Sequence, residues 1–287
     1  MKSRLVALFV GPQGLRAGWG ILLFAALLGL CTGILFLALP RGISSERALF
    51  LTEAMLLAGV AGSTAAMAWV EGRGVLSYGL GDARAPRRFL RGAVWGVVLL
   101  SMLVAGALAT GHAAIAWGDL DGASAAAYGV VYALGLTIVA LAEEMLLRGY
   151  LQVTLARLIG FWPAACVLSL AFGLMHGGNP GESRLGLVSA MLIGAVLCLC
   201  LRRSGSLWWG IGFHAAWDWA QVFLWGTPVS GFVFEGRLMK TQALGDPLWS
   251  GGDTGPEGSL LILPILALAV LVIVRSFGRT ETAAEPA

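Results

Sequence analysis

Eight apolar segments, most of them close to the roughly 20 residues that cross the hydrocarbon core of a bilayer, dominate this sequence. They run over 18–39, 49–70, 91–110, 128–147, 161–176, 185–201, 206–225 and 259–277. Of the 287 residues, 58% are hydrophobic and 12% charged, and the mean hydropathy is +0.82. So few charges cannot solvate a soluble globule, which excludes a soluble enzyme, a disordered chain and a nucleic-acid-binding protein. We expect an all-α, polytopic membrane helix bundle of about eight transmembrane helices, with residues 1–287 forming a single integral membrane domain.

The positions of Lys and Arg orient these helices. With the N-terminus inside, 14 of the 19 basic residues fall on the inner side and 5 on the outer side. Cytoplasmic loops carry such an excess, so we expect both termini to be cytoplasmic. The first segment has the length of a full span and no small-x-small cleavage site, which favours a retained span over a signal peptide. The use of Arg over Lys and the abundance of Ala and Gly favour a bacterial cytoplasmic membrane.

The four cysteines also lie inside apolar segments, at positions 31, 166, 198 and 200. A disulfide framework would place them in the connections, so we interpret them as small hydrophobic residues.

Ionisable side chains inside the apolar segments carry the main functional signal, because such residues are unfavourable in hydrocarbon and usually mark function. The acidic residues and histidines found there are Glu53, Glu143, Glu144, His176, His214 and Asp218. Five of the six lie between residues 143 and 218, on three different segments. Glu53 has no partner visible in the sequence, and we interpret it as a lining or structural residue.

The spacing of these residues separates structural from chemical roles. Glu144 and Arg148 are four residues apart, within reach of a salt bridge on one helix face. Glu143 points about 100° away from that pair and stays free. The same spacing of four joins Phe172 to His176, and His214 to Asp218.

The helical rise also brings these groups to one depth. The helix that carries Glu143 is expected to continue to about residue 157, before a break near residues 160–163. At 1.5 Å per residue, Glu143 and His176 lie about 21 Å from this inner turn, and His214 and Asp218 about 12 and 18 Å from the inner end of their own helix. A lone intramembrane histidine, or one Glu–Arg pair, is more often structural. Together at one depth, these groups favour a catalytic site.

Three ordered motifs on separate segments resemble the CAAX-protease and bacteriocin-processing (CPBP, or Abi) membrane family. They are Glu143-Glu144-x-x-x-Arg148, Phe172-x-x-x-His176 and His214-x-x-x-Asp218. Short sequence stretches at the motifs are also similar to those of the family, namely residues 148–152 and 172–176. The stretch 71–80 is similar as well. The matching region covers roughly residues 128–225, which we expect to be the catalytic core.

The resemblance implies an intramembrane endopeptidase in which Glu143 and His176 activate a water molecule for attack on the scissile carbonyl. His214 and Asp218 would stabilise the oxyanion, with Glu144, Arg148 and Phe172 in support. Asp218 departs from the prenyl-protein branch of the family, which usually has Asn there. A carboxylate beside an oxyanion is unfavourable unless it is protonated or orients His214.

A zinc mechanism is the rival chemistry, because two His and one Glu can supply three zinc ligands. The sequence has no HExxH helix and its histidines lie on separate segments, so we favour metal-free glutamate catalysis without a cofactor. The expected partners are the lipid bilayer and a membrane-embedded or membrane-proximal peptide or protein substrate, with no nucleic acid. A bacterial origin would disfavour a prenylated CAAX substrate.

Two other functions stay open. One is a non-catalytic membrane scaffold, chaperone or immunity protein in which the motifs form a structural network. The other is a proton-coupled carrier that uses Glu53, Glu143 and Asp218 as a relay.

Overall fold

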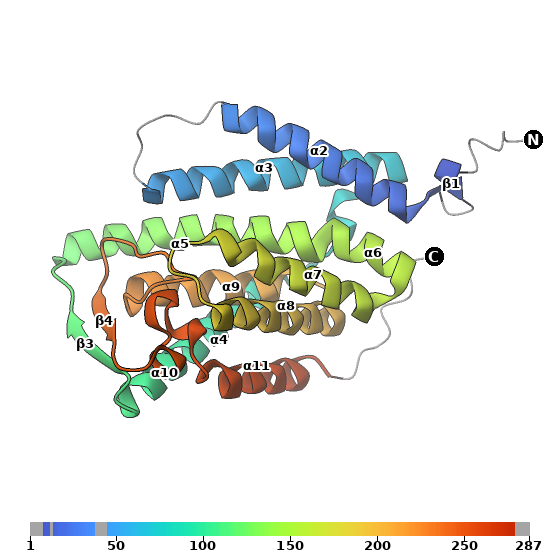
Figure 1. Ribbon diagram of the computed structural model, residues 1–287. Helices are drawn as coiled ribbons and strands as arrows, with labels where there is room; N and C mark the ends of the chain where they lie inside the picture. Colours follow the sequence, from blue (N-terminus) through green and yellow to red (C-terminus); the bar gives the residue numbers. More distant parts are fainter. Residues whose placement is uncertain (1–7, 12–13, 38–44, 279–287) are drawn as a thin grey trace, which may run out of the picture.

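The computed structural model describes residues 8–11, 14–37 and 45–278, and it is almost entirely helical (Figure 1). The helices are α2 (Ala17–Leu37), α3 (Ser45–Glu71), α4 (Ala85–Ala109), α5 (Gly122–Glu144), α6 (Leu151–Ile159), α7 (Phe161–Met175), α8 (Arg184–Ser204), α9 (Trp208–Trp219), α10 (Pro247–Ser250) and α11 (Ile262–Ser276). Two π-helical segments, η2 (Met145–Tyr150) and η4 (Ala220–Leu224), continue α5 and α9. Single 3₁₀ turns are η1 (Val75–Ser77), η3 (His176–Gly178), η5 (Gly252–Thr254) and η6 (Pro256–Gly258).

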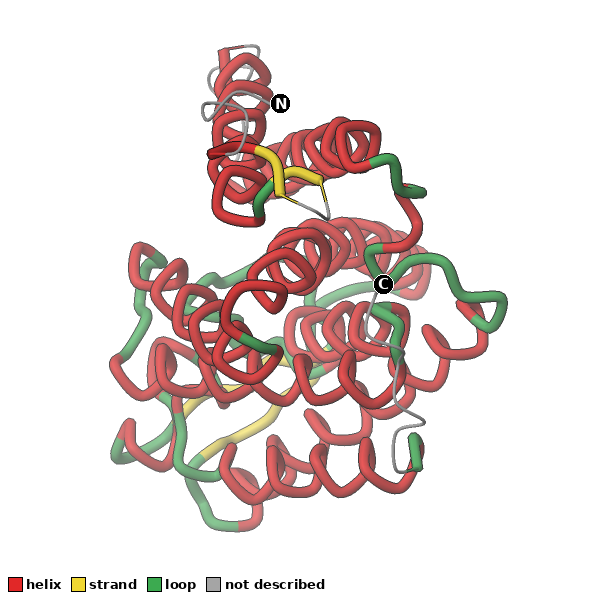
Figure 2. The backbone as a smooth tube through the Cα atoms, turned by 90° about the vertical axis from the view of Figure 1, so that its right-hand side faces the viewer, coloured by secondary structure: helices red, strands yellow, loops and turns green. Residues whose placement is uncertain are grey.

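Strands occur in the described residues only as two short antiparallel pairs, visible in the end-on view of Figure 2. The first pair is β1 (Val10–Gly11) with β2 (Gly14–Leu15), and the second is β3 (Ala113–Trp117) with β4 (Met239–Ala243). The second pair joins two connections more than 120 residues apart in the chain and lies at the end of the bundle predicted to be outside.

The predicted polytopic helix bundle is confirmed. Six described helical stretches are long and apolar enough to cross a membrane, namely Ala17–Leu37, Ala48–Glu71, Ala85–Ala109, Gly122–Ile159, Phe161–Gly178 and Arg184–Ser204. The seventh and eighth predicted segments correspond to α9 with η4, and to α11, which are shorter.

Successive helices run back and forth, so that the connections predicted to be inner gather at one end and the outer ones at the other (Figure 1). Four of the basic residues counted for the orientation lie outside the described residues, namely Lys2, Arg4, Arg41 and Arg279.

Local signals explain where several helices begin and end. The side chains of Asp121 and Ser183 accept hydrogen bonds of 2.7 and 3.0 Å from backbone N–H groups three residues on, capping α5 and α8. Gly205 ends α8 in the left-handed conformation, with φ of 65°. The predicted inner break falls at Gly160, between α6 and α7.

Helices α4 and α9 approach each other at glycines. Gly92 and Gly96 are one turn apart on α4, and a Cβ atom on them would overlap the backbone carbonyl oxygens of Trp209 and Phe213 on α9. Gly212 of α9 is pressed in the same way against the carbonyl of Phe89. Small residues at such spacing let membrane helices pack backbone to backbone. This contact fixes α9, which carries two of the predicted site residues.

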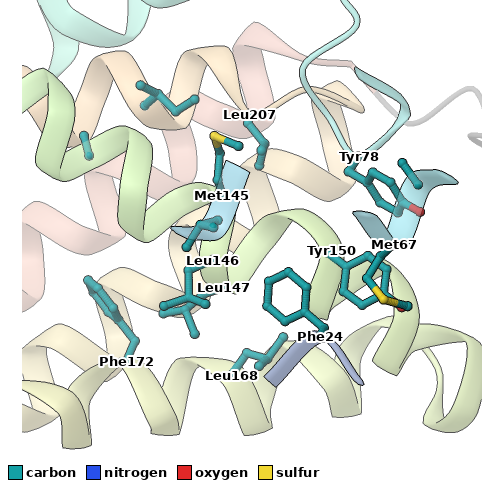
Figure 3. Close-up of a cluster of buried hydrophobic side chains, with 14 of the residues drawn as sticks. Phe24, Met67, Tyr78, Met145, Leu146, Leu147, Tyr150, Leu168, Phe172 and Leu207 are labelled. Atoms are coloured by element: carbon teal, nitrogen blue, oxygen red, sulfur yellow. The ribbon is translucent and has the colours of Figure 1, made fainter. Parts of the chain in front are cut away.

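At the inner end, aromatic contacts and hydrogen bonds join the pair α2–α3 to η2 and α6, and Figure 3 shows the aromatic residues Phe24, Tyr78 and Tyr150 among the buried hydrophobic side chains. Phe24 of α2 stacks on Tyr150 at a ring distance of 4.8 Å. Glu71, the last residue of α3, accepts hydrogen bonds from Tyr150 at 2.9 Å, Tyr78 at 3.2 Å and Arg157 at 3.0 Å. Burial and the neighbouring Glu71 carboxylate raise the pKa of Tyr78 to about 12, so this phenol remains a hydrogen-bond donor.

Candidate active site

A cavity of about 230 Å³ lies inside the bundle, walled by α3, α5, α7, α8 and α9 and lined at its outer end by parts of the outer connections. Its polar lining consists of Glu53, Glu143, His176, Asn179, Glu182, His214, Asp218, Ser230, Thr254 and Glu257, and the rest of the wall is mainly apolar. The four predicted catalytic residues, Glu143, His176, His214 and Asp218, all line this cavity although they come from three separate helical stretches.

Glu144 and Arg148 form the predicted salt bridge behind the cavity wall. Arg148 Nη1 lies 2.9 Å from Glu144 Oε1, and each residue is only 1% exposed. The guanidinium also stacks over the ring of Phe172, with its central carbon 4.5 Å from the ring centroid. Arg148, one of the 14 basic residues assigned from the sequence to the inner side, is buried inside the bundle. Its buried partner Glu144 draws it into the bundle interior.

His214 is surrounded by carboxylates. Its Nδ1 lies 3.2 Å from Glu144 Oε1, and its Nε2 lies 3.5 Å from both Glu143 Oε2 and Asp218 Oδ2. Ionised carboxylate oxygens only accept hydrogen bonds, so the ring matches this surrounding best when both nitrogens carry a proton. Asp218 therefore lies where it can orient His214, one of the two roles considered for it from the sequence.

His176 has a defined orientation as well. Its Nδ1 lies 2.7 Å from the backbone carbonyl oxygen of Phe172, which can only accept, so Nδ1 is the donor. In the neutral ring, Nε2 then carries the lone pair. The ring of Phe172 packs edge-on against His176 at 4.8 Å and lies 6.2 Å from His214. Phe172 thus contacts both histidines and the guanidinium of Arg148.

Both π-helical segments directly follow site residues. η2 begins immediately after Glu144, and η4 begins two residues after Asp218. Inside η2, Gly149 has a non-helical backbone with φ of −82° and ψ of −116°. π-Helical turns occur frequently at functional sites because they rotate the helix face out of its regular register.

Three more carboxylates line the cavity. Glu53 of α3, interpreted from the sequence as a lining or structural residue, does line it, and its Oε2 is buried without a hydrogen-bond partner. Glu182 and Glu257 were not predicted, because each lies in an outer connection where a carboxylate is ordinarily solvated. The signal that could have indicated them is their closeness in sequence to the site and to an apolar segment. Glu182 follows His176 by six residues, and Glu257 lies two residues before the last apolar segment.

Glu182 and Glu257 are held by specific contacts. Oε1 of Glu182 accepts a 2.9 Å hydrogen bond from the backbone N–H of Ser183, and Oε1 of Glu257 accepts one of 2.6 Å from Trp217 Nε1. Burial and the charge of Glu257 raise the pKa of Glu182 above its ordinary value, against the opposing effect of the Ser183 hydrogen bond. The outer end of the cavity is therefore strongly acidic.

Across residues 8–11, 14–37 and 45–278, no group of three or more His, Cys, Asp and Glu side chains is arranged to hold a metal ion.

The fold and the site define a polytopic membrane helix bundle with a cavity lined by histidines and carboxylates. Residues 124–220 match the family model described as type II CAAX prenyl endopeptidase, Rce1-like. The match spans all three motifs and confirms the predicted resemblance to the CAAX-protease family. Neither the search of curated proteins nor the search of solved structures found a match.

Proposed function

We propose that this protein is an intramembrane endopeptidase that hydrolyses a peptide bond of a membrane-associated protein or peptide. The observation that carries the proposal is the convergence of Glu143, His176 and His214 on one cavity inside a bundle of apolar helices. The family match supports this class of reaction. Residues 128–225 form the catalytic core within a single membrane domain, and the bacterial cytoplasmic membrane is the proposed location.

In the proposed mechanism, a water molecule binds between the carboxylate of Glu143 and Nε2 of His176. Both groups accept hydrogen bonds, so each accepts one from an O–H of the water, and an oxygen lone pair is left directed at the substrate carbonyl. As the oxygen attacks, one proton passes to Glu143. Glu143 then donates this proton to the leaving nitrogen when the C–N bond breaks. Phe172 positions His176 through its carbonyl group and its ring.

His214 stabilises the oxyanion in this proposal. A ring protonated on both nitrogens donates through Nδ1 to Glu144 and presents Nε2–H to the cavity, where negative charge develops on the substrate oxygen. Asp218 orients the ring rather than contacting the oxyanion. Arg148 neutralises Glu144, so that this buried carboxylate serves as a hydrogen-bond acceptor only.

The proposal predicts that Glu143→Gln abolishes cleavage while the protein stays folded. General acid–base groups contribute about 10²–10⁴-fold to rate, so a loss of at least about 100-fold is expected. The measurement compares the N-termini of membrane proteins between cells that carry the wild type and cells that carry Glu143→Gln at equal abundance. Termini that arise only with the wild type identify the substrate.

Two controls make this test specific. Glu235→Gln removes a carboxylate from the outer connection at an exposed position outside the cavity lining, and it is expected to leave the new termini unchanged. A chelator added to the purified protein is expected to leave cleavage unchanged. Identical termini in all strains, with a Glu143→Gln protein that keeps its biological effect, would contradict the protease and favour a scaffold.

A further inference from the structure

The charge of the cavity suggests what kind of substrate it accepts. Five carboxylates line it, whereas no Lys or Arg is found among its described lining residues. Like charges enclosed in one small space repel each other, and the repulsion by Glu257 on Glu182 is one cause of the raised pKa of Glu182. A cation placed between them would relieve this repulsion.

Two of these carboxylates are nine-tenths buried and still have oxygen atoms available. Asp218 is 8% exposed and accepts no hydrogen bond from any described residue, its one ionic contact being the 3.5 Å approach of His214. Glu257 is also 8% exposed, and only its Oε1 is engaged, by Trp217. Buried carboxylates are ordinarily paired or hydrogen-bonded. Their unused oxygens face a cavity that the proposed substrate must enter.

The third carboxylate, Glu182, is held at the cavity by contacts with the backbone at the start of α8. Its Oε1 is fixed by Ser183 N–H at the start of α8, and it lies so close to Gly186 that a Cβ atom there would overlap it. The absence of a side chain at Gly186 therefore makes room for the carboxylate. Thr254, which precedes η6, donates to the carbonyl of Gly181 at 3.1 Å and holds the two outer connections together. Glu182 and Glu257 are thus presented jointly by interlocked connections.

We propose that Glu182, Glu257 and Asp218 form a subsite for a cationic side chain, Lys or Arg, that lies within a few residues of the scissile bond on its outer side. This inference rests on the proposed endopeptidase function and specifies its substrate class. Carboxylates that converge on an ammonium or guanidinium group form charge-assisted hydrogen bonds. The same cavity disfavours a substrate with a free carboxylate close to the scissile bond, because its carboxylates would repel that group and the protonated ring of His214 is already shared by Glu143, Glu144 and Asp218. Basic residues on the outer side of a membrane segment are uncommon, so this subsite would select a small share of membrane proteins.

The test uses the purified full-length protein and a pool of apolar peptides with acetylated N-termini, amidated C-termini and randomised internal positions. The cleavage products are sequenced by mass spectrometry. Charge-assisted hydrogen bonds contribute roughly 1.5–3 kcal/mol, so Lys and Arg are expected to be enriched about tenfold or more near the cut. The double variant Glu182→Gln/Glu257→Gln is expected to lose this enrichment, measured as the ratio of basic to neutral residues near the cut.

Matched variants separate the possible outcomes. In both positions Gln keeps a side-chain oxygen that can accept the hydrogen bond from Ser183 or from Trp217. If the double variant fails to fold, the single variant Glu182→Gln is measured instead, and it is expected to lose part of the enrichment. Glu235→Gln is expected to retain it. Cleavage by the wild type without enrichment, or enrichment that persists in the double variant, overturns the subsite. So does preferred cleavage within three residues of a free carboxylate in a second pool without C-terminal amides. Cleavage that is no higher in the wild type than in Glu143→Gln overturns the proposed function itself.

Discussion

Glu182 is held in the folded protein in a place where its charged form is unfavourable. Burial and the nearby Glu257 raise its pKa, and these effects outweigh the Ser183 hydrogen bond and the attraction of His176. A carboxyl group whose folded pKa lies above its unfolded value contributes stability below the unfolded pKa, near pH 4, and that stability is lost as the pH rises through the folded pKa. At neutral pH this residue therefore destabilises the fold, as is common where function requires an unfavourable charge.

We predict that Glu182→Gln raises the thermal unfolding midpoint relative to the wild type at pH 7–8. The difference should shrink towards pH 4, because the wild-type carboxyl group is then neutral as well. The measurement is the unfolding midpoint of both proteins in one detergent over this pH range. A difference that does not change with pH would mean that the effect comes from packing rather than from charge.

At the residue scale, the sequence was sufficient for part of the site only. The spacing of Glu144 and Arg148 follows from helix geometry, and the pair forms as predicted. Glu143, His176, His214 and Asp218 could be brought to one depth by counting residues along helices, because a helical rise is regular. Glu182 and Glu257 could not, because the paths of the outer connections depend on contacts such as the one between Thr254 and Gly181.

At the scale of elements, hydropathy was sufficient for the helices and insufficient for their details. All eight predicted segments correspond to helices, and the predicted break falls at Gly160. Helix α4 begins at Ala85 rather than at residue 91, because its first turns carry charged residues that lower the hydropathy without opposing the helix. The pairing of β3 with β4 is non-local, and the π-helical segments have no periodic signature in the sequence.

The packing of α4 against α9 can be tested by adding a single methyl group to α4, either at the contact or away from it. Gly92→Ala should destabilise the protein by about 1–3 kcal/mol or more, because its Cβ atom would overlap backbone of α9 that cannot move independently. Gly106→Ala, in the same helix with open space around the glycine, should be neutral or slightly stabilising. Unfolding in detergent measures both. Equal stability of the two variants would contradict the backbone-to-backbone contact.

At the scale of the whole molecule, the alternating direction of successive helices decides two things. It sets the end of the bundle at which the basic residues gather and the end from which Glu182 and Glu257 reach the cavity. The α4 end that carries Arg87 and Arg88 is at the inner end, as is the start of α2, whereas Glu182 and Glu257 approach the cavity from the opposite end. If the inner end faces the cytoplasm, the acidic subsite opens toward the outer side of the membrane. The orientation of the molecule thus decides from which side a cationic substrate segment meets Glu182 and Glu257.

We predict that a membrane-impermeant maleimide labels Gln242→Cys in intact spheroplasts and labels Ala83→Cys only after permeabilisation. Both positions are exposed, and neither substitution changes a charge that sets the topology. Gln242 lies on β4 in an outer connection, and Ala83 lies in the inner connection before α4. The wild type is the control for labelling of the four native cysteines, of which Cys166 is exposed and lies in the apolar stretch Phe161–Gly178. Labelling of both variants from one side would contradict the alternation of the helices. The reverse pattern would place the acidic subsite on the cytoplasmic side, where membrane proteins carry most of their Lys and Arg, and the selectivity expected of the subsite would then be weak.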